Sequence, residues 1–277
     1  MDHLALKHKA SALKQLHHGP RVLLLPNVWD VASALLVQKA GFPALATTSA
    51  GIAFLLGYPD GQKITRREML DWVEKIARRA NVPVSADVEA GYGSRPEDAA
   101  ETARGVLDAG AVGLNLEDAT GEVEHPLTDL QLQLEKIRAV REVAAAAGVP
   151  LVLNARTDVY LREVGPPEKR YDHALMRLAA FRDAGADCLF APGVKDLETI
   201  GRLVGDLQFP LNILAGPGLP PVPQLQQLGV ARISLGSGVM RATLGALQRI
   251  TTELAGPGAY AAMENAPSFA EMNKLLE

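Results

Sequence analysis

The predicted fold rests on the pattern of residues 108–117, Asp108-Ala109-Gly110-Ala111-Val112-Gly113-Leu114-Asn115-Leu116-Glu117. The end of a helix and a glycine lead into a short apolar run, and the run closes on a polar residue. The glycine suits a helix C-terminus, where one residue in the left-handed conformation turns the chain back. An apolar run without alternation is typical of a parallel strand that helices cover on both faces. The segment therefore predicts one helix–strand unit of an α/β protein.

The same unit recurs along the whole chain. Four further glycines occupy the position of Gly110: Gly41, Gly148, Gly185 and Gly229. We predict eight strands, over residues 22–27, 44–48, 82–89, 111–117, 150–156, 188–191, 210–215 and 232–236. Eight alternating units in 277 residues indicate a (β/α)₈ barrel, the TIM barrel, which typically needs about 250 residues. A doubly wound open sheet is the alternative, but the turn at residues 26–29 lacks its G-x-G-x-x-G pattern. We therefore expect a single barrel domain over residues 1–277.

Composition and charge narrow the class of protein. Hydrophobic residues make up 48% of the chain, enough for a large core, and the formal net charge is −4. Without a basic cluster, this charge argues against nucleic acid or an anionic membrane as a partner. A single cysteine, Cys188, excludes an internal disulfide and a cysteine-based zinc site. Residues 1–20 resemble neither a signal peptide nor a membrane span, so we expect a cytoplasmic protein.

Two carboxylates, Asp87 and Glu89, end the third predicted strand ahead of a glycine-rich loop. In an extended strand these side chains, two residues apart, point to the same face. Mg²⁺ takes oxygen ligands and often only one or two carboxylates, so the pair suits a hard divalent cation. A solvated, acidic strand end is the alternative interpretation.

The active site of a TIM barrel lies at the carboxyl ends of its strands. Four acids, Asp60, Asp87, Glu89 and Glu117, can converge there with one strong base, Arg156. Alone, these acids would repel one another and raise one another's pKa values, and a bound cation would relieve that repulsion. The cluster therefore favours a metal site over a purely structural one.

Arg156 suits the carboxylate of an anionic substrate, because its planar group can form two hydrogen bonds to it. A salt bridge with Asp158 or Glu117 is the alternative. Asn154 and Asn212 also lie at strand ends around this mouth, and we count them as candidate substrate-binding residues.

Several of these residues stand in motifs that resemble the isocitrate lyase/phosphoenolpyruvate mutase superfamily. The resemblance covers essentially the whole chain and rests on Thr47-Thr48-Ser49-Ala50-Gly51, Leu56-Gly57-Tyr58-Pro59-Asp60, Ala86-Asp87-Val88-Glu89-Ala90-Gly91-Tyr92-Gly93, Leu116-Glu117-Asp118 and Asn154-Ala155-Arg156-Thr157-Asp158. It implies a Mg²⁺ ion bound directly by Asp87 and largely through water by Asp60, Glu89 and Glu117. Glu89 stands where the family more often has aspartate.

The resemblance also implies how the substrate is held. Arg156 and the loop formed by Thr48, Ser49 and Ala50 would bind the carboxylate of a 2-oxo or enol acid. The family usually has Ser-Gly where this chain has Thr48-Ser49.

The loop at residues 119–127 separates the reactions of the superfamily. Isocitrate and methylisocitrate lyases carry Lys-Lys/Arg-Cys-Gly-His there, and phosphonate mutases and phosphonopyruvate hydrolases use a Lys and an Asn. This chain has neither set and resembles members similar to oxaloacetate decarboxylase, which lack the lyase cysteine. His125 is the acid–base candidate of the loop, and an ordinary surface histidine is the alternative. With Arg156 and Asp60, it completes our set of candidate catalytic residues.

We therefore expect a Mg²⁺-dependent carbon–carbon lyase that acts on a small 2-oxo acid or dicarboxylate. The metal and Arg156 would stabilise the enolate that forms as the bond breaks, as in oxaloacetate decarboxylation. Two alternatives remain. One is phosphonate P–C chemistry of the mutase or hydrolase type, and the other is a non-catalytic protein that binds 2-oxo acids.

The C-terminal tail, residues 259–277, follows a complete set of eight units. It has an apolar face formed by Tyr260, Met263, Phe269, Met272 and Leu275. The outer ring already has its eight helices, so this face must be buried elsewhere. Members of the superfamily exchange their eighth helix between neighbours and assemble as dimers of dimers. We expect the tail to pack on a neighbouring subunit of a homotetramer.

Overall fold

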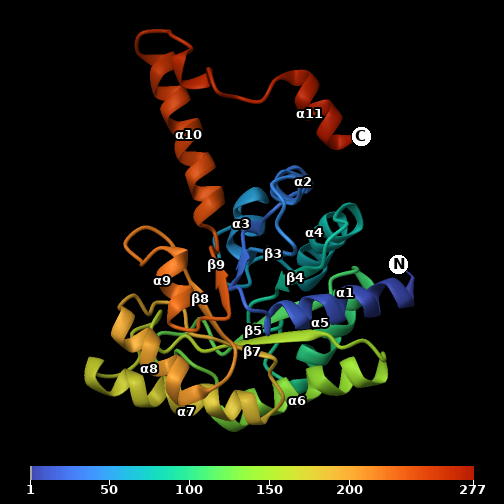
Figure 1. Ribbon diagram of the computed structural model, residues 1–277, viewed down its shortest axis with the longest axis vertical. Coiled ribbons are helices and arrows are strands. Elements are labelled where there is room, and N and C mark those ends of the chain that lie inside the picture. Colours follow the sequence, from blue (N-terminus) through green and yellow to red (C-terminus); the bar gives the residue numbers. More distant parts are fainter. Residues whose placement is uncertain (1) are drawn as a thin grey trace.

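Nine parallel strands form one sheet in the computed structural model, which describes residues 2–277 (Figure 1). The strands are β1 (Leu23–Leu25), β2 (Asn27–Val28), β3 (Leu45–Thr47), β4 (Val84–Asp87), β5 (Gly113–Glu117), β6 (Val152–Arg156), β7 (Cys188–Phe190), β8 (Leu211–Leu214) and β9 (Arg232–Ser234). Their order in the sheet is β1-β9-β8-β7-β6-β5-β4-β3-β2. Because only Pro26 separates β1 from β2, the two ends of the sheet meet and the barrel is nearly closed. The predicted TIM-type barrel is confirmed.

Pro26 divides the first predicted strand in two. β1 pairs with β9, where Leu24 lies opposite Ile233, whereas β2 pairs with β3, where Val28 lies opposite Thr47. Proline has no N–H to donate to a neighbouring strand, so the ladder changes partner at this residue. The other seven predicted strands each overlap an observed one.

Helices connect the strands and cover the barrel. They are α1 (His3–Leu16), α2 (Val31–Lys39), α3 (Ser49–Leu55), α4 (Arg66–Arg79), α5 (Pro96–Asp108), α6 (Leu130–Ala146), α7 (Pro167–Asp183), α8 (Leu197–Leu207), α9 (Val222–Gln227), α10 (Gly238–Ala255), the 3₁₀ turn η1 (Ala261–Met263) and α11 (Phe269–Leu276). Side-chain caps fix where some of them begin, as Asp30 does for α2 and Thr65 for α4. Within residues 2–277, none of these helices combines the length and apolarity that a membrane span requires.

α1 packs at the amino-terminal end of β5. A Cβ atom at Gly113, the first residue of that strand, would lie 2.8 Å from Cδ2 of the buried Leu13. Glycine is therefore required for this close approach between the helix and the barrel.

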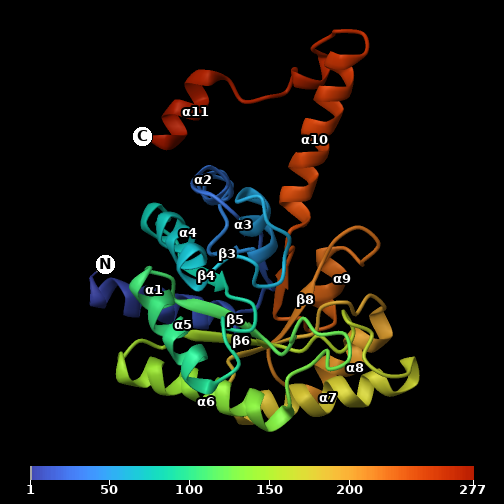
Figure 2. The ribbon, with the colours of Figure 1, turned by 180° about the vertical axis from the view of Figure 1, so that it is seen from behind.

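The last helices leave the barrel wall. α10 extends away from it, and the chain then returns toward α2 as α11 (Figures 1 and 2). Arg79 donates a hydrogen bond of 2.6 Å to the carbonyl of Leu276. Met272 and Leu275 line a groove between α11 and α2, whereas Phe269 is 84% exposed. The predicted apolar face is thus only partly covered by its own chain.

We propose that a neighbouring subunit covers the rest of this face. Removing the chain beyond Gly256 should lower the molar mass measured by size-exclusion chromatography with light scattering, because Tyr260 and Phe269 can then no longer be buried between subunits. Replacing Val123, an exposed residue outside the tail, by serine is the control and should leave the mass unchanged. The same number of subunits in the truncated and full-length proteins would count against a role of the tail in assembly.

Candidate active site

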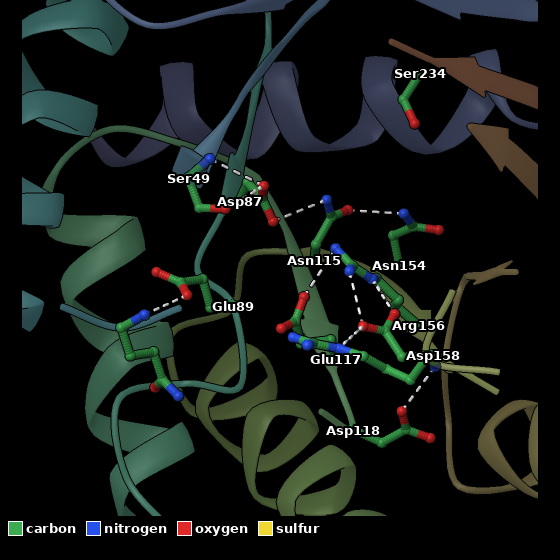
Figure 3. Close-up of polar contacts among 12 residues, drawn as sticks. Ser49, Asp87, Glu89, Asn115, Glu117, Asp118, Asn154, Arg156, Asp158 and Ser234 are labelled. Carbon is green, nitrogen blue, oxygen red and sulfur yellow. Dashed lines mark hydrogen bonds and ion pairs between the residues drawn. The ribbon is translucent and has the colours of Figure 1, made fainter. Parts of the chain in front are cut away.

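Asp87 is the last residue of β4, and its carboxylate is held from two sides (Figure 3). The backbone N–H and the hydroxyl of Ser49 donate to Oδ2 at 3.0 and 2.8 Å, and Nδ2 of Asn115 donates to Oδ1 at 3.2 Å. Ser49 is placed by Thr48, whose side chain accepts the N–H of Gly51 and caps α3. The Asp87 carboxylate is therefore buried in a fixed orientation at the mouth of the barrel.

Glu89 does not continue the strand. β4 ends at Asp87, and Glu89 has a φ of +51°, in the left-handed region. Its carboxylate, labelled in Figure 3, accepts hydrogen bonds from the N–H of Gln62 and from the hydroxyl of Tyr92, which the figure does not draw. The expectation that Asp87 and Glu89 share one face of an extended strand is therefore wrong. Their charges still interact, since burial, Asp60 and Asp87 together raise the pKa of Glu89 to about 7.

Arg156 ends β6 and lies between two acids (Figure 3). Its Nε and Nη2 donate to the two carboxylate oxygens of Asp158 at 2.6 and 2.9 Å, and its Nη1 lies 2.8 Å from Oε2 of Glu117. Burial lowers the pKa of Arg156, but Glu117 and Asp158 outweigh it and raise the pKa above its ordinary value. Both salt bridges considered from the sequence are present. Asp158 nevertheless uses only two of the five N–H donors of the guanidinium.

A second, buried ion pair holds Asp158 in place behind Arg156. Asp118 accepts the backbone N–H of Asp158 through Oδ1 at 2.9 Å, and Nε of Arg177 through Oδ2 at 2.7 Å. Arg177, on α7, also donates to a backbone carbonyl just after the loop that follows β5. This network therefore fixes the partner of Arg156 and the end of that loop together.

The mouth carries more negative than positive charge. Partial desolvation and the charge of Asp87 raise the pKa of Asp60, which is still exposed, whereas burial raises the pKa of Glu117 well above its usual range. Within residues 2–277, no three acidic, histidine or cysteine side chains lie close enough to ligate one ion together. Mg²⁺ needs only one or two carboxylates and keeps several water ligands. The donors therefore suit a hydrated Mg²⁺ ion, and we propose Asp87 as its direct ligand, with Asp60, Glu89 and Glu117 acting through water.

Three further candidate substrate-binding residues lie around this centre. Ala50 is half-buried in the first turn of α3. Asn154, on β6, donates to Oδ1 of Asn115 at 2.7 Å. Asn212, on β8, exchanges hydrogen bonds with the hydroxyl of Ser234 at 3.1 and 3.3 Å. The two asparagines thus belong to a polar layer inside the barrel, and Ala50 lies beside the residue that holds Asp87.

His125 lies outside this group of contacts. Its side chain is exposed, and its carbonyl accepts the hydroxyl of Thr120, which closes the loop after β5. The imidazole lines a side pocket together with Lys136, and of the described residues neither Asp87 nor Arg156 lines that pocket. The structure therefore places His125 at the rim.

Asn115 and Arg177 are absent from the candidates chosen from the sequence. Asn115 lies two residues before Glu117 on one strand, so both side chains point to the same face. The same spacing relates Asn154 to Arg156, and this signal could have identified Asn115 from the sequence. Arg177 meets Asp118 across 59 positions of sequence, and no local pattern reveals such a partner.

Comparison with known proteins agrees with this geometry. Residues 13–255 match the family described as phosphoenolpyruvate phosphomutase. The chain is 30% identical over 229 residues to the oxaloacetate decarboxylase of Rhodopseudomonas palustris (strain BisB5). This aligned region covers 79% of this chain and 73% of that protein. The chain is also 30% identical over 208 residues to the 2-methylisocitrate lyase of Bacillus subtilis (strain 168). That aligned region covers 73% of this chain and 65% of the lyase.

A solved structure extends the likeness to the whole chain. The crystal structure of a candidate lyase/mutase from Burkholderia cenocepacia J2315 is 39% identical, with a TM-score of 0.93, and covers 98% of this chain and 96% of that one. Together, these matches show that the chain belongs to the phosphoenolpyruvate phosphomutase family, within the isocitrate lyase/phosphoenolpyruvate mutase superfamily of lyases and mutases.

Proposed function

We propose that this protein is a Mg²⁺-dependent lyase that breaks a carbon–carbon bond in a small 2-oxo acid, with oxaloacetate decarboxylation as its reaction. One observation carries the proposal. A fixed carboxylate, Asp87, and a charged arginine, Arg156, lie at the same barrel mouth. Together they can hold a metal ion and the carboxylate of a substrate.

Each residue of the mouth would have a separate task. Arg156 would bind the carboxylate of the substrate with the N–H donors that Asp158 and Glu117 leave free, and these two acids keep the guanidinium from rotating. Ser49 keeps Asp87 oriented toward the 2-oxo end of the substrate. Mg²⁺, when bound, supplies positive charge beside the oxygen that becomes negative in the enolate.

Besides the groups that hold the substrate and the metal ion, decarboxylation requires only a proton donor for the enolate. As CO₂ leaves, the electron pair of the broken bond passes into the pyruvate enolate, so no acid is needed at that step. The enolate carbon then takes a proton, and water at the mouth or His125 at the rim would supply it.

The loop after β5 supports this reaction over those of the cysteine-dependent relatives. Ala119 pairs with Leu127 in an antiparallel bridge, so the loop is closed on itself. Its residues include Glu122, Glu124 and His125 but no Cys or Lys. The loop therefore offers neither the thiol acid of the isocitrate-type lyases nor a cation for a migrating phosphoryl group.

Side-by-side assays with Mg²⁺ test this function. We expect CO₂ release from oxaloacetate, and no turnover of isocitrate, methylisocitrate or phosphoenolpyruvate, because the loop lacks the groups that those reactions use. Pyruvate formation is followed with lactate dehydrogenase, organic acids by chromatography and phosphorus compounds by ³¹P NMR. Arg156→Ala is the blank.

Other outcomes would assign the protein differently. Turnover of phosphonopyruvate would favour P–C chemistry, to which the family description gives weight. Cleavage of methylisocitrate at a rate typical of true lyases would show that the loop argument is wrong. Binding of 2-oxo acids in calorimetry without any turnover would leave a binding protein.

A further inference from the structure

Arg232, the first residue of β9, is fully buried inside the barrel. Its Nη2 donates a hydrogen bond of 3.4 Å to Oδ1 of Asn115, whereas Nε and Nη1 have no hydrogen-bond partner within residues 2–277. No carboxylate in this part of the chain forms a salt bridge with Arg232. Burying a cation without such a partner is costly, so stability does not explain this residue.

Asn115 links Arg232 to the metal-site candidate Asp87. Its Oδ1 accepts from Nη2 of Arg232 and from Nδ2 of Asn154, at 3.4 and 2.7 Å, and its Nδ2 donates to Oδ1 of Asp87 at 3.2 Å. Figure 3 shows the part of this row that runs from Asp87 through Asn115 to Asn154. Asp87, Asn115 and Asn154 lie opposite one another on the adjacent strands β4, β5 and β6. A continuous row of polar contacts therefore joins a buried cation to the carboxylate.

The donor and acceptor roles in this row are set at its ends. An asparagine amide can present either its oxygen or its nitrogen to a neighbour, so Asn115 and Asn154 alone do not fix an orientation. Arginine can only donate and an ionised aspartate can only accept. Arg232 therefore requires the oxygen of Asn115 on its side, which leaves the NH₂ group of Asn115 facing Asp87.

We propose that Arg232 is a positioning residue for Asp87, which it orients through the amide of Asn115. This inference rests on the proposed metal site. It explains the unfavourable burial of the Arg232 charge by a role in metal binding. With Ser49 on one carboxylate oxygen and Asn115 on the other, the Asp87 carboxylate has one orientation in which to meet a metal ion. Without Arg232, the Asn115 oxygen loses one of its two donors, so the amide holds the Asp87 carboxylate less firmly in its orientation.

Replacing Arg232 by methionine should lower the metal affinity without lowering the thermal stability. Loss of an outer partner of a metal ligand typically costs about 10–100-fold in metal affinity, and we expect a loss in this range for Arg232→Met. A buried charge replaced by an apolar side chain of similar volume often leaves stability unchanged or improves it. The melting temperature should therefore be unchanged or higher.

The test measures binding of Mn²⁺ to the metal-free, full-length protein by calorimetry, and the spectrum of the bound ion by electron paramagnetic resonance. Arg232→Met and Arg232→Gln should both lose affinity and broaden the spectrum, and Arg232→Lys, which still only donates, should recover part of the affinity. In an Asn115→Ala background, Arg232→Met should have no further effect on affinity. Arg141→Met is the control, because this part-buried arginine pairs with Asp187 at 2.7 Å and belongs neither to the row that leads to Asp87 nor to the contacts of Arg156. It should keep the Mn²⁺ affinity of the parent.

The outcomes separate this inference from the proposed function. A parent protein that binds no Mn²⁺ would refute the metal site itself. A parent that binds Mn²⁺, with Arg232→Met and Arg232→Gln binding it equally well, would overturn only the role of Arg232. A lower melting temperature with unchanged affinity would make Arg232 a structural residue. If Arg232→Met does not fold, Arg232→Gln and Arg232→Lys give the comparison.

Discussion

Replacing Asp87 by alanine is expected to abolish Mg²⁺-dependent activity and to lower the affinity for Mg²⁺ by more than about 100-fold. That loss exceeds the range of about 10–100-fold that is typical for outer partners of a metal ligand, because Asp87 is proposed as the direct ligand. The substitution also leaves both donors of Ser49 without their acceptor. Calorimetric titration of the metal-free protein with Mg²⁺ measures the effect.

Glu89→Gln is the matched control for Asp87→Ala. Glu89 lies at the same mouth, but its carboxylate is engaged by Gln62 and Tyr92, and we expect it to act on the metal through water. Its substitution should weaken Mg²⁺ binding by no more than about 10–100-fold. Equal Mg²⁺ affinity in Asp87→Ala and in the parent would refute the assignment of the direct ligand.

Arg156→Lys is expected to lower kcat/KM for a 2-oxo acid by about 10²–10³-fold, the loss that follows removal of one preorganised donor from an active site. Lysine keeps the charge, but it cannot contact both oxygens of Asp158 as Nε and Nη2 do at 2.6 and 2.9 Å. It therefore has neither the fixed orientation nor the paired donors. Steady-state kinetics, with binding of oxalate measured separately, distinguish a loss of affinity from a loss of rate.

Arg162→Lys is the control for Arg156→Lys. Arg162 also pairs with Asp158, but at 3.7 Å and with 47% of its side chain exposed. Exposed ion pairs contribute little, so this substitution should change the kinetics only slightly. If Arg156→Lys proves as active as Arg162→Lys, Arg156 is a structural ion pair and not the substrate clamp.

The barrel could be predicted from the sequence because its signal is local. The helix-ending glycine, the apolar strand and the polar strand end of residues 108–117 all lie within one short segment, and this segment and its repeats account for five of the eight predicted strands. Two details were not local. Pro26 splits a strand only because its neighbours are β9 and β3, and Glu89 takes a positive φ in a loop held by Gln62, 27 positions away.

The composition of the site could be predicted better than its contacts. Asp87, Glu117 and Arg156 were identified as strand ends, which parallel strands bring to one mouth. The salt bridges of Arg156 with Glu117 and Asp158 could be considered from the sequence only as an alternative to substrate binding. The contact of Asn115 with Arg232, across 117 positions, depends on how the barrel closes. His125 could not be placed from the sequence, because a loop position does not fix the direction of a side chain.

The most direct test of the proposed function is the rate of CO₂ release from oxaloacetate in the presence of Mg²⁺. The parent protein is compared with Arg156→Ala and with free Mg²⁺ at the same concentration, which by itself promotes this reaction slowly. The proposed function predicts release well above the metal background in the parent, loss of this release when Mg²⁺ is chelated, and a return to background in Arg156→Ala. Equal rates in the parent, the variant and the metal control would contradict it.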